Sequence, residues 1–235
     1  MKLIINILAL IIMAAQYVKA YNEPTINPTA KFIATTGDEQ EGIAFSGSAP
    51  VKATLSAGTE NADGWNAYYE WRFYRENEKT PYIIRYEENT DYVFNTSGTH
   101  LVKLYATFTQ GNDTVRYGDE YWLEARAITV SISESKLEMP NAFSPNGDDI
   151  NDIYKPMSNY QSIVDFHAYI FNRWGQKLFE WTDPSKGWDG TYNGNAVKQG
   201  VYFCRVRAKG ADGRVFDIKT DVNLLRGFTE TTTTN

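Results

Sequence analysis

The stretch AYYEWRF, residues 67–73, decides the fold class of this chain. Ala67, Tyr69, Trp71 and Phe73 alternate with more polar neighbours, and this period of two predicts a strand with one buried face. The same alternation recurs at residues 51–55 and 102–107, while the turn-forming segments lie at 58–64, 95–98 and 110–113. Short alternating runs at this spacing predict a β-sandwich.

The strand pattern returns in the last hundred residues. Val164, Phe166, Ala168 and Ile170 form one face of a predicted strand. Residues 201–208 and 215–224 flank Gly210-Ala211-Asp212-Gly213, and Asp-Gly between two alternating runs is a strong hairpin signal. We therefore predict an all-β chain: two small immunoglobulin-like β-sandwich domains in tandem after a signal peptide.

The first twenty residues have a different character. Lys2 is followed by an apolar run from Leu3 to Ala15 and by Val18-Lys19-Ala20, which fits a secretory signal peptide cleaved after Ala20. A membrane anchor is the alternative, but spanning a bilayer takes roughly 20 apolar residues. Removing Lys2 and Lys19 leaves 21 basic and 29 acidic residues. A net charge of −8 argues against nonspecific nucleic-acid binding and suits a soluble extracellular protein.

Little in the composition points to catalysis. Cys204 is the only cysteine, which excludes an intrachain disulfide, and its apolar strand pattern predicts a buried thiol. His100 and His167 both fall within strand runs, and no G-x-S-x-G nucleophile motif is present. We therefore predict no enzyme, with no catalytic residues.

Four segments in the C-terminal half carry a family resemblance. They are MPNAFSPNGDDIND (139–152), FNRWGQKLFEW (171–181), GWDGTYNG (187–194) and GVYFCRV (200–206), with Leu224-Leu225-Arg226 closing the series. In this order they resemble the gliding-motility-associated C-terminal domain of Bacteroidetes, a type B sorting domain of the type IX secretion system. Asp149 departs from the family pattern, where a Gly is expected. The motif residues are Pro140, Asn141, Phe143, Ser144, Pro145, Asn146, Gly147, Asp148, Asn151, Asp152, Asn172, Arg173, Trp174, Gly175, Trp188, Asp189, Gly190, Gly200 and Tyr202.

A second resemblance concerns the N-terminal half. Ala49-Pro50-Val51, Tyr69-Glu70-Trp71-Arg72-Phe73 and the segment 92–102 resemble a PKD-type immunoglobulin-like domain, in which the Trp of the YxWxF strand lies in the core. The predicted organisation is a signal peptide at 1–20, a PKD/immunoglobulin-like domain at 21–133, a linker at 134–139, a type B sorting domain at 140–228 and a disordered tail at 229–235.

The sorting-domain resemblance implies a route and partners. The chain reaches the periplasm, is recognised by the type IX secretion machinery with help from an outer-membrane partner protein, and ends secreted or at the cell surface. The expected role is noncatalytic, in adhesion or surface assembly, with a surface polysaccharide or protein as ligand. A carbohydrate-binding or enzymatic cargo, or a component of the gliding or secretion apparatus, stays open as an alternative.

Two further sites follow from residue types. The carboxylates of Asp148, Asp149 and Asp152 are candidate Ca²⁺ ligands, but Ile150 falls where an EF-hand loop needs oxygen, so a turn capped by side chains is favoured and no cofactor is expected. Trp65, Tyr68, Tyr74 and Tyr82 are candidates for an exposed aromatic platform for sugars or a protein partner.

Overall fold

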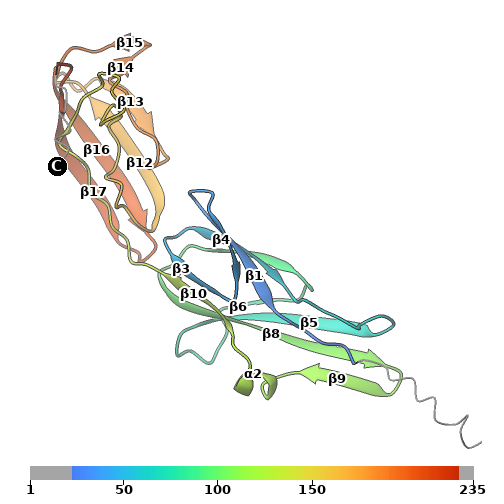
Figure 1. The fold of residues 1–235 in the computed structure, drawn as a ribbon. Helices are drawn as coiled ribbons and strands as arrows, with labels where there is room; N and C mark the ends of the chain where they lie inside the picture. Colours follow the sequence, from blue (N-terminus) through green and yellow to red (C-terminus); the bar gives the residue numbers. More distant parts are fainter. Residues whose placement is uncertain (1–22, 228–235) are drawn as a thin grey trace, which may run out of the picture.

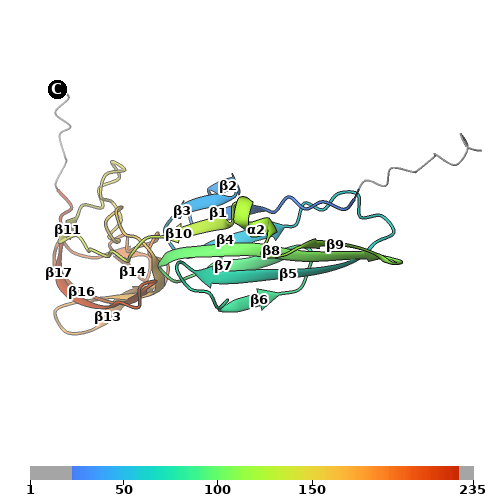
Figure 2. The same cartoon turned by 90° about the horizontal axis from the view of Figure 1, so that it is seen from below.

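The computed structural model describes residues 23–227, and it is all-β apart from one short helix, α2 (Tyr121–Glu124). The predicted signal peptide with its cleavage at Ala20, and the predicted tail at 229–235, lie outside the described residues. Two hydrophobic cores divide the chain into an N-terminal domain and a C-terminal domain, which lie end to end (Figure 1, Figure 2).

The N-terminal domain is a sandwich of two sheets. One sheet has the order β2-β1-β4-β7 and the other β3-β10-β8-β5-β6, with β9 also paired to β8. The strands are β1 (Thr29–Ala34), β2 (Glu39–Gly42), β3 (Ala44–Gly47), β4 (Val51–Ser56), β5 (Asn66–Arg75), β6 (Ile83–Arg85), β7 (Thr90–Phe94), β8 (Gly98–Gln110), β9 (Asp113–Tyr117) and β10 (Ile128–Ile132). All pairs are antiparallel except β3 with β10, so the sandwich combines meander and crossover connections.

The alternation read from the sequence sets the core of this sandwich. Trp71 and Phe73 on β5 are fully buried, as are Val51 and Leu55 on β4 in the opposite sheet. The pairing Trp71 with Leu104 aligns the apolar faces of β5 and β8. Since a one-residue slip would turn each apolar set toward solvent, this burial fixes the register.

The C-terminal domain is built on one five-stranded sheet, in the order β11-β17-β16-β12-β13, with a small β14-β15 sheet beside it. Its strands are β11 (Ala142–Phe143), β12 (Ile163–Phe171), β13 (Lys177–Trp181), β14 (Thr191–Tyr192), β15 (Asn195–Ala196), β16 (Gly200–Gly210) and β17 (Val215–Leu224). The predicted hairpin around Gly210–Gly213 is confirmed by ten paired positions from Gly200–Leu224 to Lys209–Val215. The predicted burial of Cys204 is also confirmed, and that burial raises the pKa of its thiol to about 12.

The two domains meet at the tip of the β16–β17 hairpin. Ala211 lies buried against the N-terminal core, and its carbonyl oxygen accepts from Ser97 N at 3.0 Å. The hydroxyl of buried Ser162 accepts from Ala49 N at 3.1 Å and lies 2.8 Å from Ser133 Oγ. Because these contacts join buried polar groups from both domains, they hold the domains in one relative orientation.

The predicted linker at 134–139 takes part in this junction. Ser135 N and Oγ both donate to the carboxylate of Asp212, and Lys136 exchanges two backbone hydrogen bonds with Gln161. Leu137 is buried in the C-terminal core. This segment is therefore held to the domains through Ser135, Lys136 and Leu137, while Glu134 and Glu138 are exposed. The predicted domain limits stay a proposal.

Candidate functional site

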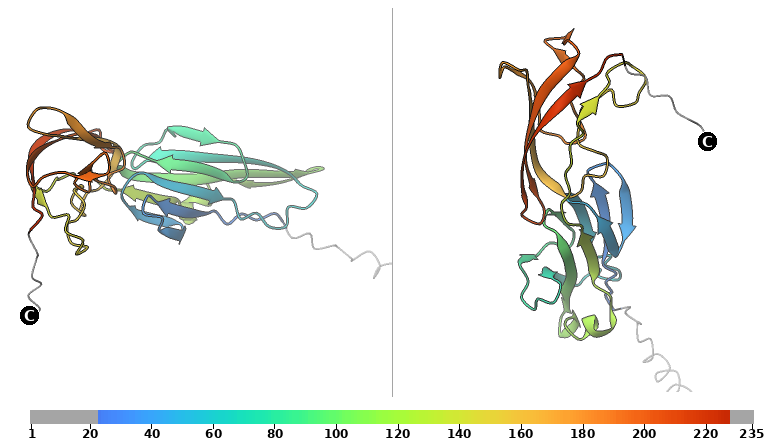
Figure 3. Two further views of the ribbon diagram at one scale, coloured as in Figure 1. Left: turned by 90° about the horizontal axis from the view of Figure 1, so that it is seen from above. Right: turned by 90° about the vertical axis from the view of Figure 1, so that its left-hand side faces the viewer.

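The motif segments gather at the distal end of the C-terminal domain, the end away from the N-terminal domain (Figure 3). Strand β12 begins at the junction and ends distally at Phe171, whereas β16 begins distally at Gly200 and returns to the junction. The turn after β12, the segment before β16 and the chain after β17 therefore meet at one end of the sheet.

The loop of residues 144–152 is organised around one carboxylate. Asp152 Oδ1 accepts from the backbone N–H groups of Asn146 and Gly147 at 2.7 and 2.8 Å, and Oδ2 accepts from Asp149 N at 2.9 Å. These hydrogen bonds favour the charged form and lower the pKa of Asp152. The conformation of the loop is thus stabilised by the carboxylate of Asp152 at its C-terminal end.

The other calcium candidates serve the same loop. Asp148 Oδ1 accepts from Ile150 N at 2.9 Å, Asp148 Oδ2 accepts from Asn146 Nδ2 at 2.8 Å, and Asp149 is exposed with a φ of 64°. Within residues 23–227, no three His, Cys, Asp or Glu side chains gather in a way that could hold a metal ion. This geometry favours the capped turn, and the expectation that no calcium binds stays a prediction to be tested.

A buried aromatic cluster lies under the loop. The ring of Trp188 is 5.3 Å from that of Phe143 and 5.1 Å from that of Tyr202, centroid to centroid. Tyr154 and Trp188 exchange two backbone hydrogen bonds of 2.8 and 3.0 Å, and Trp188 Nε1 donates to Thr191 O. The Trp of the GWDG motif therefore acts as a core residue that joins three motif segments.

The turn after β12 is organised around Asn172. Its Oδ1 accepts from Trp174 N at 2.9 Å and from Gln176 N at 3.1 Å, and its Nδ2 donates to Gln176 Oε1 at 2.9 Å. Gly175 closes the turn with a φ of 76°, a conformation that favours glycine. Gln176 Nε2 then lies 3.2 Å from Tyr192 Oη, linking the turn to β14.

Arg226 fastens the distal end together. Its Nη2 donates to Gly190 O at 2.8 Å and its Nε to Val197 O at 2.9 Å, while Nη1 lies 3.5 Å from Pro145 O. Gly190 is buried with a φ of 77°, so the chain can approach both Arg226 and Pro145 there. One side chain thus contacts both ends of the β14–β15 hairpin and the loop that contains Pro145.

The predicted motif residues divide by burial. Buried are Phe143, Ser144, Trp188, Gly190 and Tyr202; half-buried are Pro140, Pro145, Asn146, Asp152, Asn172 and Gly200; exposed are Asn141, Gly147, Asp148, Asn151, Arg173, Trp174, Gly175 and Asp189. Most of the motif residues form the loops and the core of the domain. Trp174 differs from them because it is a large apolar side chain that is exposed.

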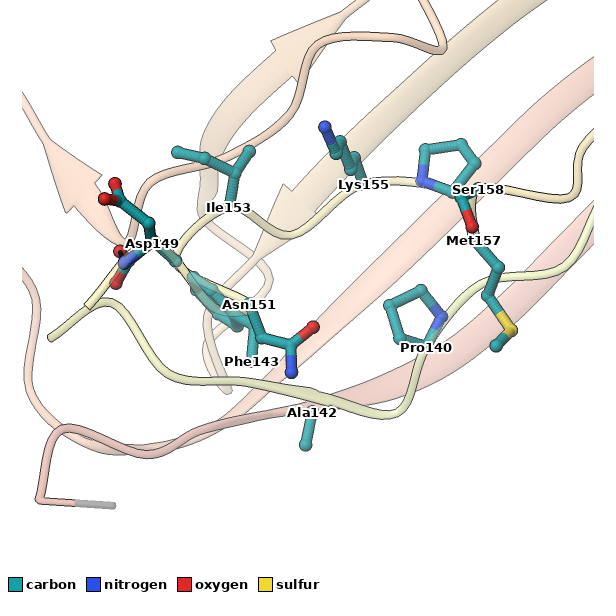
Figure 4. A pocket seen from close by; sticks show the side chains of 11 residues that line it. Pro140, Ala142, Phe143, Asp149, Asn151, Ile153, Lys155, Met157 and Ser158 are labelled. Carbon is teal, nitrogen blue, oxygen red and sulfur yellow. Dashed lines mark hydrogen bonds between the residues drawn. The ribbon is translucent and has the colours of Figure 1, made fainter. Parts of the chain in front are cut away.

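A groove of about 430 Å³ runs beside the loop. Figure 4 shows Pro140, Ala142 and Phe143 along one wall and the segment from Asp149 to Ser158 along the other. Ile153 and Met157 are among its exposed apolar side chains. The groove belongs to the same domain as the motif residues.

Sequence reasoning missed two residues of this end. Tyr154, fully buried beside Trp188, lies in no alternating run that would have marked it. Arg226 was quoted as part of the closing Leu224-Leu225-Arg226, but nothing in the sequence indicates which carbonyl groups it reaches. Long-range contacts of this kind need the fold before they can be seen.

Of the four residues predicted to form an exposed aromatic platform in the N-terminal domain, Tyr68 is exposed and the other three are not. Tyr74 is buried, and Tyr82 packs on the core with its hydroxyl 2.7 Å from His100 Nδ1. Trp65 is half-buried against the core. Tyr68 is exposed to 54%, and it pairs with Tyr86, 57% exposed, at a ring distance of 6.0 Å.

Comparison with known proteins agrees with the geometry of the C-terminal domain. Residues 137–217 match the family described as the CHU_C Type IX secretion signal domain. No curated protein matches the chain. In residues 23–227, no helix has the length and apolar character needed to cross a membrane. The match spans the Asp152 loop, the Asn172 turn and the Trp188 cluster, so residues 137–217 are similar to a type IX secretion signal domain, which indicates sorting by that system.

Proposed function

We propose that this protein is a noncatalytic surface-associated cargo, used for adhesion or surface assembly, whose C-terminal domain is read by the type IX machinery and an outer-membrane partner protein. The observation that carries the proposal is the distal end itself, where Asp152, Asn172 and Arg226 hold three of the four motif segments in fixed loops. A rigid, preorganised end loses little conformational entropy when a partner binds.

The electrostatics of the acids support a noncatalytic role. A general acid or base at neutral pH needs a carboxyl pKa raised toward 7. The carboxyl groups of the described residues whose pKa departs from the ordinary value all shift downward, and they are Asp91, Asp152, Glu180, Asp183, Asp212 and Asp217. Each of these carboxylates accepts hydrogen bonds or an ion pair, as expected for structural acids.

The export test compares the full chain with a chain lacking residues 137–227, in a host that possesses type IX secretion. The full chain should become accessible to protease added outside the cells, whereas the shortened chain should stay in the periplasm. A secretion-deficient strain gives the baseline. Surface exposure of the shortened chain at the full-chain level would refute the role of the C-terminal domain.

Adhesion is tested separately, because export does not require it. Cells that display the protein should attach to a surface or to one another more than cells of a deletion strain. Restoration of attachment by added purified protein would support a role in surface assembly. Equal attachment of both strains would refute adhesion while leaving export intact.

A carbohydrate ligand is the second candidate, favoured by the exposed Tyr68–Tyr86 pair on the outer face of the larger sheet. Glu70 and Arg72 lie on the same face and supply hydrogen-bonding groups beside the rings. Affinity electrophoresis through gels containing soluble polysaccharides should then slow the wild type but not Y68A/Y86A. Equal mobility of both proteins in every polysaccharide tested would remove this candidate.

A further inference from the structure

Trp174 is exposed, whereas the other tryptophans are not. It lies at the tip of the β12–β13 turn with 84% of its surface accessible. The other five tryptophans, all within residues 23–227, are buried or half-buried. An indole left in water forgoes about 1.5–3 kcal/mol of burial energy, so its exposed placement points to a use outside the chain.

The backbone beneath Trp174 is held in place. Asn172 N donates to Gln176 O at 3.0 Å, and Gly175 N donates to Asn172 O at 3.0 Å. The Asn172 side chain adds the three hydrogen bonds to Trp174 and Gln176 described above. A turn of five residues with this many internal hydrogen bonds presents the indole at low entropic cost, as in the aromatic anchors of protein interfaces.

The surroundings of Trp174 are apolar and basic. A hollow of about 350 Å³ opens beside it and is lined among others by Arg173, Lys198 and Val201. Val201 is an exposed apolar side chain, as is Phe203, which pairs with Phe171 on the adjacent strand. None of the residues that line this hollow, all of them described, is acidic, although the chain as a whole has a net charge of −6.

We propose that Trp174, Arg173, Lys198 and Val201 form a docking surface, the Trp174 surface, for an acidic protein partner with an apolar recess that accepts the indole. The inference rests on the proposed function, because it places the contact with the export partner on this surface. Trp and Arg are the side chains most enriched among interface hot spots. Recognition of an anionic membrane takes clusters of about 4–8 Lys or Arg residues. Only two cations lie beside this indole among the residues that line the hollow, so an acidic protein surface is the better match.

The test uses matched exposed residues in the full chain. Leu123, in the N-terminal domain, is also 84% exposed and serves as the control for removing an exposed apolar side chain. In a secreting host, W174A should lower the ratio of surface to periplasmic protein about tenfold or more, as expected for an interface hot spot, while L123A leaves it unchanged. R173E/K198E should lower the ratio as well, because it reverses the charge presented to an acidic rim.

The readouts separate the inference from the proposed function. Export of W174A at the wild-type level, together with retention of the chain lacking 137–227, overturns the Trp174 surface and leaves the sorting role standing. Export of both W174A and the chain lacking 137–227 overturns the sorting role itself. Thermal melting of purified W174A within a few degrees of wild type shows that lost export is not lost folding.

Two direct measurements identify the class of partner. A photocrosslinking amino acid at position 174 should yield a discrete protein adduct in secreting cells that the same group at position 123 does not. Flotation with vesicles of phosphatidylethanolamine and phosphatidylglycerol should show no Trp174-dependent binding. If the wild type bound the vesicles and W174A did not, the proposal of a protein partner would be overturned in favour of a membrane surface.

Discussion

Arg226 donates from Nη2 to the carbonyl oxygen of Gly190, 36 residues earlier in the chain, at 2.8 Å. The same guanidinium donates from Nε to Val197 O and approaches Pro145 O, so one side chain joins the 144–152 loop to the chain around β14 and β15. The guanidinium spreads its N–H donors over three nitrogens in one rigid plane, so it can reach carbonyl groups that are too far apart for the three donors of a single ammonium nitrogen.

Replacing Arg226 should therefore loosen the whole distal end. R226A leaves the carbonyl groups of Gly190 and Val197 without this donor, and we expect a loss of about 2 kcal/mol in the free energy of unfolding. R226K should recover only part of it, because an ammonium cannot reach three carbonyls in the same geometry. Urea denaturation of the purified chain measures the loss, with exposed Arg207 replaced by Ala as the control. Equal midpoints for R226A and R207A would contradict the clamp.

For Asp152 we predict a local effect on its loop, because its partners are backbone N–H groups of that one loop. D152A should speed hydrogen exchange at the amides of Asn146, Gly147 and Asp149, the three groups that the carboxylate holds. The folded-state pKa of Asp152 is lowered, so its stabilising effect is present above the unfolded value of about 3.9 and is lost as the pH falls through the folded pKa. In the control variant D189A, which removes an exposed acid from another turn, these three amides should stay as protected as in the wild type. Unchanged protection of the amides in D152A would refute the proposed role of Asp152 in closing the loop.

Calcium is expected not to bind this loop measurably. The oxygens of Asp148 and Asp152 already accept hydrogen bonds within it, and a bound ion would have to displace those donors. Isothermal calorimetry of the mature chain with Ca²⁺ should show the heat of dilution alone, equal to that of D148A/D152A. A saturable heat that only the wild type gives would establish a calcium site after all.

The sequence predicted strands better than it predicted contacts between them. The alternation at residues 67–73 identified Tyr69, Trp71 and Phe73 as core because a period of two directly reports which side chains share a face. It could not place Tyr74 and Tyr82, whose burial depends on neighbours from other strands. The contacts of Arg226 and Ser162 join residues dozens of positions apart, and no local pattern carries that information.

Ser162 tests the coupling between the two domains. It is buried with a φ of 48°, and its hydroxyl accepts from Ala49 N across 113 residues of sequence. S162A leaves that buried N–H without its acceptor, and we expect a loss of about 1–3 kcal/mol. S162G also loses the acceptor but relieves the left-handed backbone, so it should be less destabilising than S162A. Calorimetry of both variants checks the order, and wild-type stability of S162A would show that the junction does not depend on this contact.

His100 should make the N-terminal domain sensitive to mild acid. Its Nε2 lies 2.9 Å from the carbonyl oxygen of Thr96 and 3.2 Å from Arg75 Nη1, and its Nδ1 lies 2.7 Å from Tyr82 Oη, so both ring nitrogens have hydrogen-bond partners within the fold. Burial lowers the pKa of His100, and the nearby Arg75 guanidinium disfavours the charged ring further.

A histidine buried in its neutral form contributes fully above the unfolded pKa of about 6.5, because neither state is then protonated. As the pH falls below about 6.5, the unfolded chain takes up a proton that the folded chain refuses, and stability declines by up to about 1.4 kcal/mol per pH unit until the folded pKa is reached. Urea midpoints measured from pH 7.5 to 5 should therefore fall for the wild type and for H167Q, whereas H100Q should show a weaker decline. The same slope in H100Q as in the wild type would assign the pH dependence to other groups.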